Sequence, residues 1–592
     1  MRLNKKYLIW FTVVSLLASC TKNLNQAPQS SATRDVVFTS PDGLALYANS
    51  FYDSIPGIND LFRKDGDISD YGAENAVPNL IRPDAFGARQ SSGWTWTKLR
   101  NINYFLANNN SPLVIQSVRD NYTGVAKFFR AYFYYGMVQR FGDVPWIGKP
   151  LTVNDTALLY GHRDPHSKVM DSVLADLNSA IAMITTTDAS RTLVTKWVAY
   201  GLKSRICLFE GTYQKYQRGD LTASNRWLQE ASTAAKAVID SGGFSLNTLN
   251  GTDMSYRNVF ISTAPVASEV MLAIASNQAL AVLNDANWWY TSSTYGVRLS
   301  FTRTFVNTYL NIDGTPFTDK PGHDTLVFWN ETQNRDLRLK QTIRTPGYNR
   351  ISSGKLVRTP PAFNYTYTGY MPIKWSLDDT YYDGGTLNTN SIPFMRYAEI
   401  LLNYAEARAE LQQLTDDDWK NTVGALRKRA GITLNGVNTK PTVVDPYMSA
   451  NYYPDVTDAS LMEIRRERGI ELALEGFRFA DLTRWKHGEL VSKPWTGIYV
   501  PALNTLYDLD QDGKNDVCFY TGSTAPGSVA GVTYVNVSAD PQKLEHGTYG
   551  EIHWLDNIAR PWDDKFYLYP IPYNDTQLNP NLLPQNPGWS AQ

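Results

Sequence analysis

The chain has 592 residues, of which 43% are hydrophobic and 19% are charged, and its net charge is −1. This balance leaves no excess of basic groups to hold a nucleic acid, so nucleic acid is not expected among its partners. Three cysteines are too few for a framework of disulfide bonds.

The first residues have the pattern of a bacterial lipoprotein signal. Basic residues precede an apolar run at 7–18, which is too short to cross a bilayer as a helix. A Leu-Ala-Ser-Cys segment then ends at Cys20, where a lipoprotein signal peptidase would cut and leave an acylated thiol. Acyl chains anchor a protein without any transmembrane helix. We predict a signal peptide at 1–19 and a lipidated tether at 20–40; the alternative is an ordinary signal in which Cys20 is incidental.

Helical periodicity dominates two parts of the chain, 41–240 and 396–487. Apolar residues there recur with the period that places them on one face of a helix. The helices come in pairs joined by short links, although no sustained period of about 34 residues marks regular tetratricopeptide repeats. The helices are predicted at 96–108, 125–140, 167–184, 194–213, 227–239, 397–411, 419–430 and 461–475.

The two remaining parts, 241–395 and 488–592, are rich in Gly, Pro, Asn, Asp, Thr and aromatic residues. They contain few long periodic runs and are predicted to form loops, hairpins and short strands. Long ordered loops are the usual place for recognition. We therefore expect a helical scaffold with long insertions that carry the binding surface.

Aromatic residues indicate the class of ligand. The chain has 16 Trp and 36 Tyr, which is more than a helical core of this kind needs. The flat C–H surface of a pyranose ring packs on the face of Trp or Tyr, while its hydroxyl groups need planar donors and acceptors. Aromatic residues with polar neighbours in loops therefore favour a sugar ligand.

Trp94 and Trp96 form the first candidate patch. They are two residues apart, so in an extended segment both side chains would lie on one side. The polar partners predicted for this patch are Arg82, Asp84, Arg89 and Gln90.

The second candidate patch lies at 284–295. Adjacent Trp288 and Trp289 cannot both point the same way in a regular element, so one is expected to be packed and the other displayed. The displayed residue would act together with Tyr290 or Tyr295. The alternative for both patches is that their aromatic residues pack beneath long loops.

An acidic stripe follows the predicted helix at 461–475. The stripe consists of Glu463, Glu467, Glu471 and Glu475, and the arginines three residues from its members are Arg466, Arg468 and Arg478. A capping box of Ser460 and Glu463 marks the helix start. Paired carboxylates could serve a glycosidase, but its general acid needs a raised pKa, and an adjacent arginine lowers it. The stripe is therefore predicted to be structural.

An Asp-rich loop at 508–516 matches the first nine positions of a calcium-binding loop. Its predicted ligands are Asp508, Asp510, Asp512 and Asp516, with Gly513 at the sharp turn. Phe519 stands at the twelfth position, where a bidentate Glu is expected. The loop is either a structural calcium site or a plain Asp/Gly turn between two strands.

Five segments in the expected order together resemble the SusD/RagB family of outer-membrane lipoproteins. They are 124–145 (GVAKFFRAYFYYGMVQRFGDVP), 368–375 (TGYMPIKW), 393–410 (PFMRYAEILLNYAEARAE), 460–486 (SLMEIRRERGIELALEGFRFADLTRWK) and 566–589, which contains YLYPIP and QNPGW. The match at 368–375 is the weakest. The resemblance covers nearly all of the mature chain. Members of the family capture glycans or peptides and pass them to a TonB-dependent transporter.

The resemblance implies a mainly α fold, with a tetratricopeptide-like helical-repeat scaffold and a loop-rich, mixed α/β ligand-binding region in one domain at 41–592. It also implies a lipid-anchored protein on the outer membrane of a Gram-negative bacterium, facing the exterior, with a SusC-like TonB-dependent partner. A ligand-stacking Trp occurs in the family near the position of Trp94 and Trp96. The expected function is non-catalytic binding of an oligo- or polysaccharide, for which no cofactor is required. Alternatives are RagB-like peptide binding and, less favoured, a surface glycoside hydrolase.

Overall fold

The computed structural model describes residues 37–64 and 68–590. The predicted signal peptide, Cys20 and the first part of the tether lie outside the described residues. Within those ranges, no helix is both long enough and apolar enough to cross a membrane.

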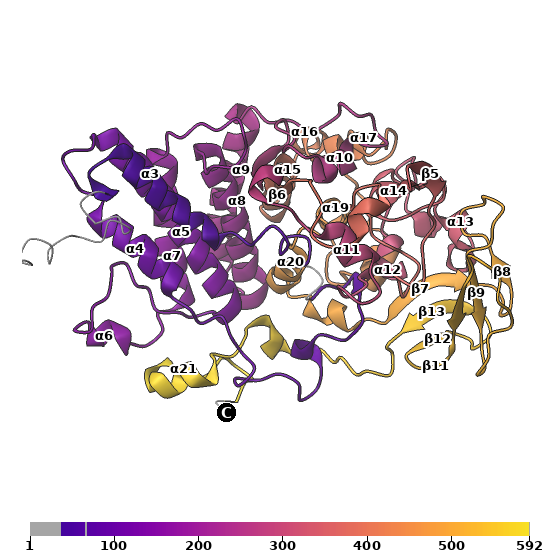
Figure 1. Ribbon diagram of the computed structural model, residues 1–592. Coiled ribbons are helices and arrows are strands. Elements are labelled where there is room, and N and C mark those ends of the chain that lie inside the picture. Colours follow the sequence, from indigo (N-terminus) through magenta and orange to yellow (C-terminus); the bar gives the residue numbers. More distant parts are fainter. Residues whose placement is uncertain (1–36, 65–67, 591–592) are drawn as a thin grey trace, which may run out of the picture.

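Long helices form one half of the molecule (Figure 1). They are α3 (Pro41–Asn49), α4 (Thr97–Asn108), α5 (Gln116–Phe141), α7 (His166–Met183), α8 (Lys196–Tyr213) and α9 (Leu221–Ser241). The array continues with α15 (Tyr397–Glu410), α19 (Ala459–Glu471) and α20 (Arg478–Trp485). Helix α5 packs against α4 and α7, α8 against α7 and α9, and α15 against α9 and α19. The structure is mainly helical, as predicted.

Side-chain caps fix where several of these helices begin. Ser40, Thr195 and Asp220 cap α3, α8 and α9. Each cap satisfies a backbone amide that the first helical turn leaves unpaired. Helix α19 is capped by Asp458, whose carboxylate accepts a hydrogen bond from the Ser460 amide at 2.8 Å. The capping box predicted at Ser460 is therefore wrong, because Asp458 takes the N-cap position.

The two larger sheets lie at the opposite end of the molecule from α3, α4 and α7 (Figure 1). A four-stranded sheet has the order β11 (Ser538–Ala539), β12 (Gln542–Leu544), β13 (Gly550–Trp554) and β7 (Trp495–Val500). A three-stranded sheet contains β10 (Thr533–Asn536), β9 (Val517–Tyr520) and β8 (Leu506–Tyr507), with β9 and β10 parallel. The pairs are β1 (Gly72–Ala73) with β3 (Ser300–Phe301), β2 (Val270–Ile274) with β6 (Ile392–Arg396), and β4 (Asn349–Ser352) with β5 (Lys355–Arg358).

Short helices occupy much of the remaining chain. They are α6 (Thr156–Leu159), α10 (Ser255–Ile261), α11 (Ala286–Thr291), α12 (Arg303–Val306), α13 (Phe328–Glu331), α14 (Arg338–Thr342), α16 (Asp416–Asn421), α17 (Val423–Arg429), α18 (Pro446–Asn451) and α21 (Tyr573–Leu578). The region 241–395 is thus loop-rich, with several helices of one or two turns.

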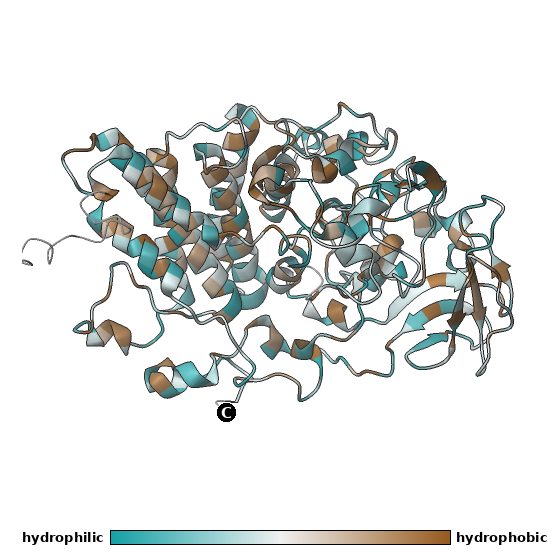
Figure 2. Ribbon diagram, in the orientation of Figure 1, coloured by the Kyte–Doolittle hydropathy of each residue, from teal (hydrophilic) through white to brown (hydrophobic). Residues whose placement is uncertain are grey.

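A continuous core joins the helical and loop-rich parts. One cluster of buried apolar side chains runs from Phe38 to Leu582, and a second includes Trp419, Trp485 and Trp495. Figure 2 shows hydrophobic and hydrophilic residues on the same long helices, as expected where one face packs inward and the other meets water. Because the main cluster draws on both parts of the chain, they share one core.

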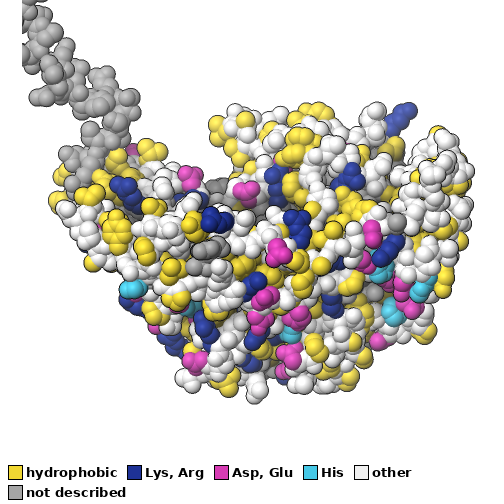
Figure 3. Space-filling view, turned by 90° about the horizontal axis from the view of Figure 1, so that it is seen from below, with side chains coloured by type: hydrophobic (Ala, Val, Ile, Leu, Met, Phe, Trp, Pro, Cys, Tyr) yellow, Lys and Arg dark blue, Asp and Glu magenta, His cyan; other side chains and the backbone are white. Residues whose placement is uncertain are grey.

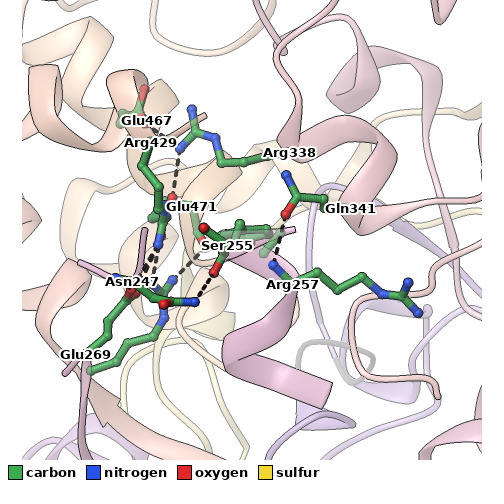
Figure 4. Close-up of polar contacts among 12 residues, drawn as sticks. Asn247, Ser255, Arg257, Glu269, Arg338, Gln341, Arg429, Glu467 and Glu471 are labelled. Carbon is green, nitrogen blue, oxygen red and sulfur yellow. Dashed lines mark hydrogen bonds and ion pairs between the residues drawn. The ribbon is translucent and has the colours of Figure 1, made fainter. Parts of the chain in front are cut away.

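A buried charge network joins α19 to the loop-rich part (Figure 4). Glu467 and Glu471 are fully buried, and the guanidinium of Arg338 contacts them at 2.5 and 2.8 Å. Glu471 also pairs with Arg396, at 2.7 Å, and with Arg429. Burial alone would raise the pKa of Glu471, but the three arginines hold it well below its ordinary value. Glu471 therefore stays charged inside the fold.

The predicted ladder of neighbouring arginines is only partly present. Arg466 pairs with Glu463 at 3.2 Å, as predicted. Arg468 instead pairs with Asp481 at 2.8 Å, and Arg478 also finds its carboxylate outside the stripe. Because α19 is buried among other elements, most of its cations come from segments far away in the sequence.

Candidate ligand-binding site

The aromatic patch around α11 contains a stacked pair of rings. The centroids of Trp288 and Tyr295 lie 3.6 Å apart, with 13° between the ring planes, and both side chains are partly exposed. Trp289 meets Tyr295 edge-on at 5.9 Å and packs against the main core. Tyr290 is buried, and its hydroxyl donates to the Phe62 carbonyl at 2.9 Å. Trp288, Trp289 and Tyr295 are therefore all partly exposed, while Tyr290 is buried beneath them.

Polar groups hold the stacked pair in place. The hydroxyl of Tyr295 donates to the Asp285 carboxylate at 2.6 Å and accepts from Arg63 at 3.0 Å. Arg63 also pairs with Asp285, and its guanidinium lies 4.3 Å from the Trp289 ring. Partial burial alone would lower the pKa of Arg63, but the Asp285 carboxylate raises it above its ordinary value. Arg63 therefore stays a cation beside the aromatic rings.

Asp285 anchors the patch from behind the rings. It is 2% exposed, and its Oδ1 atom is buried without a hydrogen-bond partner among the described residues. Leaving a buried acceptor unpaired is costly. The part of this polar group that a ligand can reach is Arg63, whose side chain is 24% exposed and lines a surface pocket.

Hollows adjoin this patch between the loop-rich part and the helices. A pocket of about 340 Å³ is lined by Trp289, Arg63 and Lys64, among others. A second pocket, of about 320 Å³, shares Lys64 and lies between α5 and α20, with Phe133 and Phe477 in its wall. The two pockets are therefore neighbours, and Trp289 connects the first of them to the aromatic patch.

Trp94 faces the interior, contrary to its predicted display. It is 9% exposed and meets Trp96 and Phe141 edge-on, at 5.3 and 5.0 Å. The prediction that Trp94 and Trp96 share a side is confirmed, but that side faces α5, while Gly93 and Thr95 line the second pocket. Trp94 therefore belongs to the core, because α5 supplies an apolar surface for it.

Trp96 is half-buried, with its ring 5.7 Å from that of Phe133. A ligand role for Trp96 stays a prediction. Arg82 and Arg89 are both exposed, and the Arg89 guanidinium lies 4.1 Å from the Tyr573 ring. Their contact with a ligand also stays a prediction.

The Asp-rich loop brings three of its four predicted ligands together. Oxygen atoms of Asp508, Asp510 and Asp516 lie within 4.8 Å of one another. Asp512 is outside this group, and its carboxylate pairs with Lys514 at 3.1 Å. Burial, followed by the nearby carboxylates, raises the pKa of Asp516 to about 6.

Sequence analysis missed Arg63 and two tyrosines near α11, and it gave no role to Asp285 within the patch at 284–295. Arg63 is 222 residues from Asp285, so no local pattern connects them. Tyr381 and Tyr382 lie in the short helix η8 (Thr380–Asp383), which packs against α11, and Tyr381 is 67% exposed. The doubled Tyr before Asp-Gly-Gly, in a loop-rich part, is a signal that could have indicated them.

Comparison with known proteins identifies the family. A family model described as "SusD family" matches residues 249–589, which is more than half of the chain. A second model, described as "Starch-binding associating with outer membrane", matches residues 93–208. Two curated relatives, SusD-like proteins P2 and P38 of Formosa agariphila, are each 23% identical to the chain. Their alignments cover 83% and 82% of this chain and 92% of each relative.

Solved structures agree with this assignment. A SusD-like protein from Bacteroides fragilis has a TM-score of 0.69 at 22% identity, over 95% of this chain and 100% of that one. A SusD-like carbohydrate-binding protein from the same organism has a TM-score of 0.68 at 19% identity, over 92% and 100%. The chain therefore belongs to the SusD family and has its mainly α, tetratricopeptide-like fold.

Proposed function

We propose that this protein is a cell-surface lipoprotein that binds an oligo- or polysaccharide and passes it to a SusC-like TonB-dependent transporter. The observation that carries the proposal is the partly exposed Trp288 and Tyr295 pair beside Arg63, which lines the adjoining pocket. The family supports it, since relatives in the solved structures are called carbohydrate-binding and surface glycan-binding proteins.

The geometry suggests how a sugar would be held. The C–H face of a pyranose would pack on the outer side of the stacked Trp288 and Tyr295 pair, while a hydroxyl accepts a hydrogen bond from Arg63. A few such contacts correspond to micromolar to millimolar affinity, or about 4–8 kcal/mol. Binding of this strength permits release of the ligand to a transporter.

The same proposal assigns no catalytic step to the protein. Of the acidic stripe, Glu471 and Glu475 have pKa values held low by arginine and lysine partners despite burial, which does not suit a general acid. Glu331 and Glu551 have pKa values raised by burial, but both carboxylates face the buried Arg303, at 3.3 and 3.5 Å. The pKa shifts of these four glutamates therefore follow from their burial and their charged neighbours.

The proposed location follows from the N-terminal pattern and the family. The signal and Cys20 would place a lipid anchor at the outer membrane, and one matching family model is described as associating with that membrane. The protein would then cover the outer mouth of the transporter as a hinged lid.

On the face shown in Figure 3, basic and acidic side chains of the described residues are interspersed.

The proposal is tested by native affinity gels with the chain from Thr21 onward. Gels containing neutral or acidic polysaccharides, or a mixture of peptides, would be compared with empty gels. We expect retardation by one class of polysaccharide and no release of shorter sugars from it. Retardation by peptides alone would contradict sugar binding, and release of shorter products would contradict a non-catalytic role.

A further inference from the structure

The loop between β8 and β9 contains a group of carboxylates that the proposed function does not use. Asp508 and Asp510 follow β8, and Asp516 immediately precedes β9. Their oxygen atoms, one from each residue, lie within 4.8 Å of one another. Gly513 turns the chain between them with a φ of +86°, a conformation that suits glycine.

No cation of the described residues is paired with this group, although Arg358 lies near enough to act electrostatically on Asp510. Within the described parts of the chain, no Lys or Arg forms an ion pair with Asp508, Asp510 or Asp516. Asp510 is only 3% exposed, and its Oδ2 atom has no hydrogen-bond partner among the described residues. A buried carboxylate of this kind is costly unless a cation or a donor reaches it.

We propose that Asp508, Asp510 and Asp516 bind one calcium ion. Carboxylate oxygens are hard ligands, and a loop of this length can add backbone carbonyls and water to reach the six to eight oxygens that calcium accepts. Magnesium fits less well, because it demands near-ideal octahedral geometry and gives up its water reluctantly. Asp512 is not a ligand in this arrangement, since its carboxylate is turned towards Lys514.

The residue types also determine how tightly the loop would bind calcium. Phe519 occupies the position where calcium loops of the helix–loop–helix type carry a bidentate Glu. Without that ligand, the dissociation constant is expected in the weaker range, roughly 10⁻⁵ to 10⁻³ M. Such a site suits the cell exterior, where calcium is more abundant than inside a cell.

The bound ion would act on stability. It would join the end of β8 to the start of β9, and Val517 and Phe519 in β9 belong to the main core. A ligand that binds only the folded state raises the melting temperature. The loop lies at the strand-rich end of the molecule, away from α11 (Figure 1), so the site is separate from the proposed sugar site.

Calcium titration of the chain from Thr21 onward tests the proposal. After EDTA treatment and dialysis, CaCl₂ and MgCl₂ would be titrated by calorimetry, and Tm would be measured with and without each ion. We expect one calcium ion per chain, a Tm increase of several degrees with calcium, and a much smaller increase with magnesium. Absence of both saturable heat and a Tm shift at about 10 mM calcium, well above the expected range, would overturn the proposal.

Variants identify the ligands. Asp510→Asn and Asp516→Asn should each weaken calcium binding by roughly tenfold or more. Asp512→Asn is the matched control, with the same charge change in the same loop, and should bind calcium nearly as the wild type does. If Asp510→Asn does not fold, Asp516→Asn alone is compared with the wild type and with the control. Equal calcium affinity in wild type and Asp516→Asn, or an equal loss in Asp512→Asn, would overturn the proposed ligand set.

Discussion

The surroundings of a tryptophan decide whether its ring can contact a ligand. Trp94 is enclosed by Trp96 and Phe141, so little of its ring meets water. Trp288 has the Tyr295 ring on one face and remains partly exposed. Trp94 therefore contributes to stability, and Trp288 is the ring proposed to bind the ligand.

The Trp94→Ala substitution tests this division. It should lower the free energy of unfolding by about 3–5 kcal/mol, because it leaves a large cavity against α5. Urea unfolding measures the loss, and glycan binding per folded molecule should stay unchanged. Trp329→Ala, at a partly exposed residue of α13, is the control and should cost much less. Loss of binding in Trp94→Ala without loss of stability would restore Trp94 to the site.

Residue spacing shows which side chains of a segment lie on the same side, but it does not show whether that side is buried. Residue spacing correctly placed Trp94 next to Trp96. Their direction depends on Phe141 and Phe133 in α5, which come together with them only in the fold. Arg63 was not predicted for a similar reason, because its partner Asp285 comes from a distant segment of the sequence.

At the scale of elements, α19 is stabilised by charges from several other segments. Arg338 begins α14, Arg396 ends β6, and Arg429 ends α17, and all three contact Glu471. These pairs tie α19 to three elements at once. Each arginine is buried, so removing their shared carboxylate would leave charges unpaired inside the protein.

The Glu471→Gln substitution should therefore lower the free energy of unfolding by about 3–5 kcal/mol. Glu545→Gln serves as the control, because Glu545 is half-exposed and should change stability by less than about 0.5 kcal/mol. Chemical unfolding of both variants provides the measurement. Equal stability of the two variants would mean that the network does not hold α19 in place.

Helix positions were predicted better than helix ends and partners. The predicted helix at 167–184 matches α7 (His166–Met183) closely. The helix predicted at 227–239 begins earlier, at Leu221, because Asp220 caps it. The helix predicted at 419–430 is divided into α16 and α17 where Thr422 leaves helical geometry, with ψ at −92°. Periodicity gives the buried face, whereas caps and breaks depend on local bonds and packing.

At the scale of the whole molecule, buried carboxylates couple stability to pH. Glu406, Glu471 and Glu475 all have pKa values below the ordinary 4.5 of Glu, because arginine or lysine partners outweigh the effect of burial. Between the unfolded and folded pKa values, the unfolded chain binds more protons, so stability rises with pH. Their contribution is complete above the unfolded value and is lost as pH falls through the lower folded values.

Urea unfolding between pH 7 and pH 3 measures this dependence. We expect these groups to contribute a constant stability down to about pH 5 and a falling one below about pH 4.5. The fall should be shallower in Glu471→Gln, which has lost one of the groups. Glu331 and Glu551, whose pKa values are raised, act in the opposite direction, so the comparison between the two proteins is the decisive one. An equally steep fall in Glu471→Gln and the wild type would contradict the assignment of a charged Glu471 to the core.

The stacked rings beside α11 are proposed to bind sugar, a claim that calorimetric titration of Trp288→Ala tests. The titrant is an oligosaccharide from whichever polysaccharide retards the wild type, and Trp329→Ala is the control. We expect Trp288→Ala to bind about tenfold more weakly than the wild type at nearly unchanged Tm, and Trp329→Ala to bind normally. Wild-type affinity in Trp288→Ala would contradict the claim.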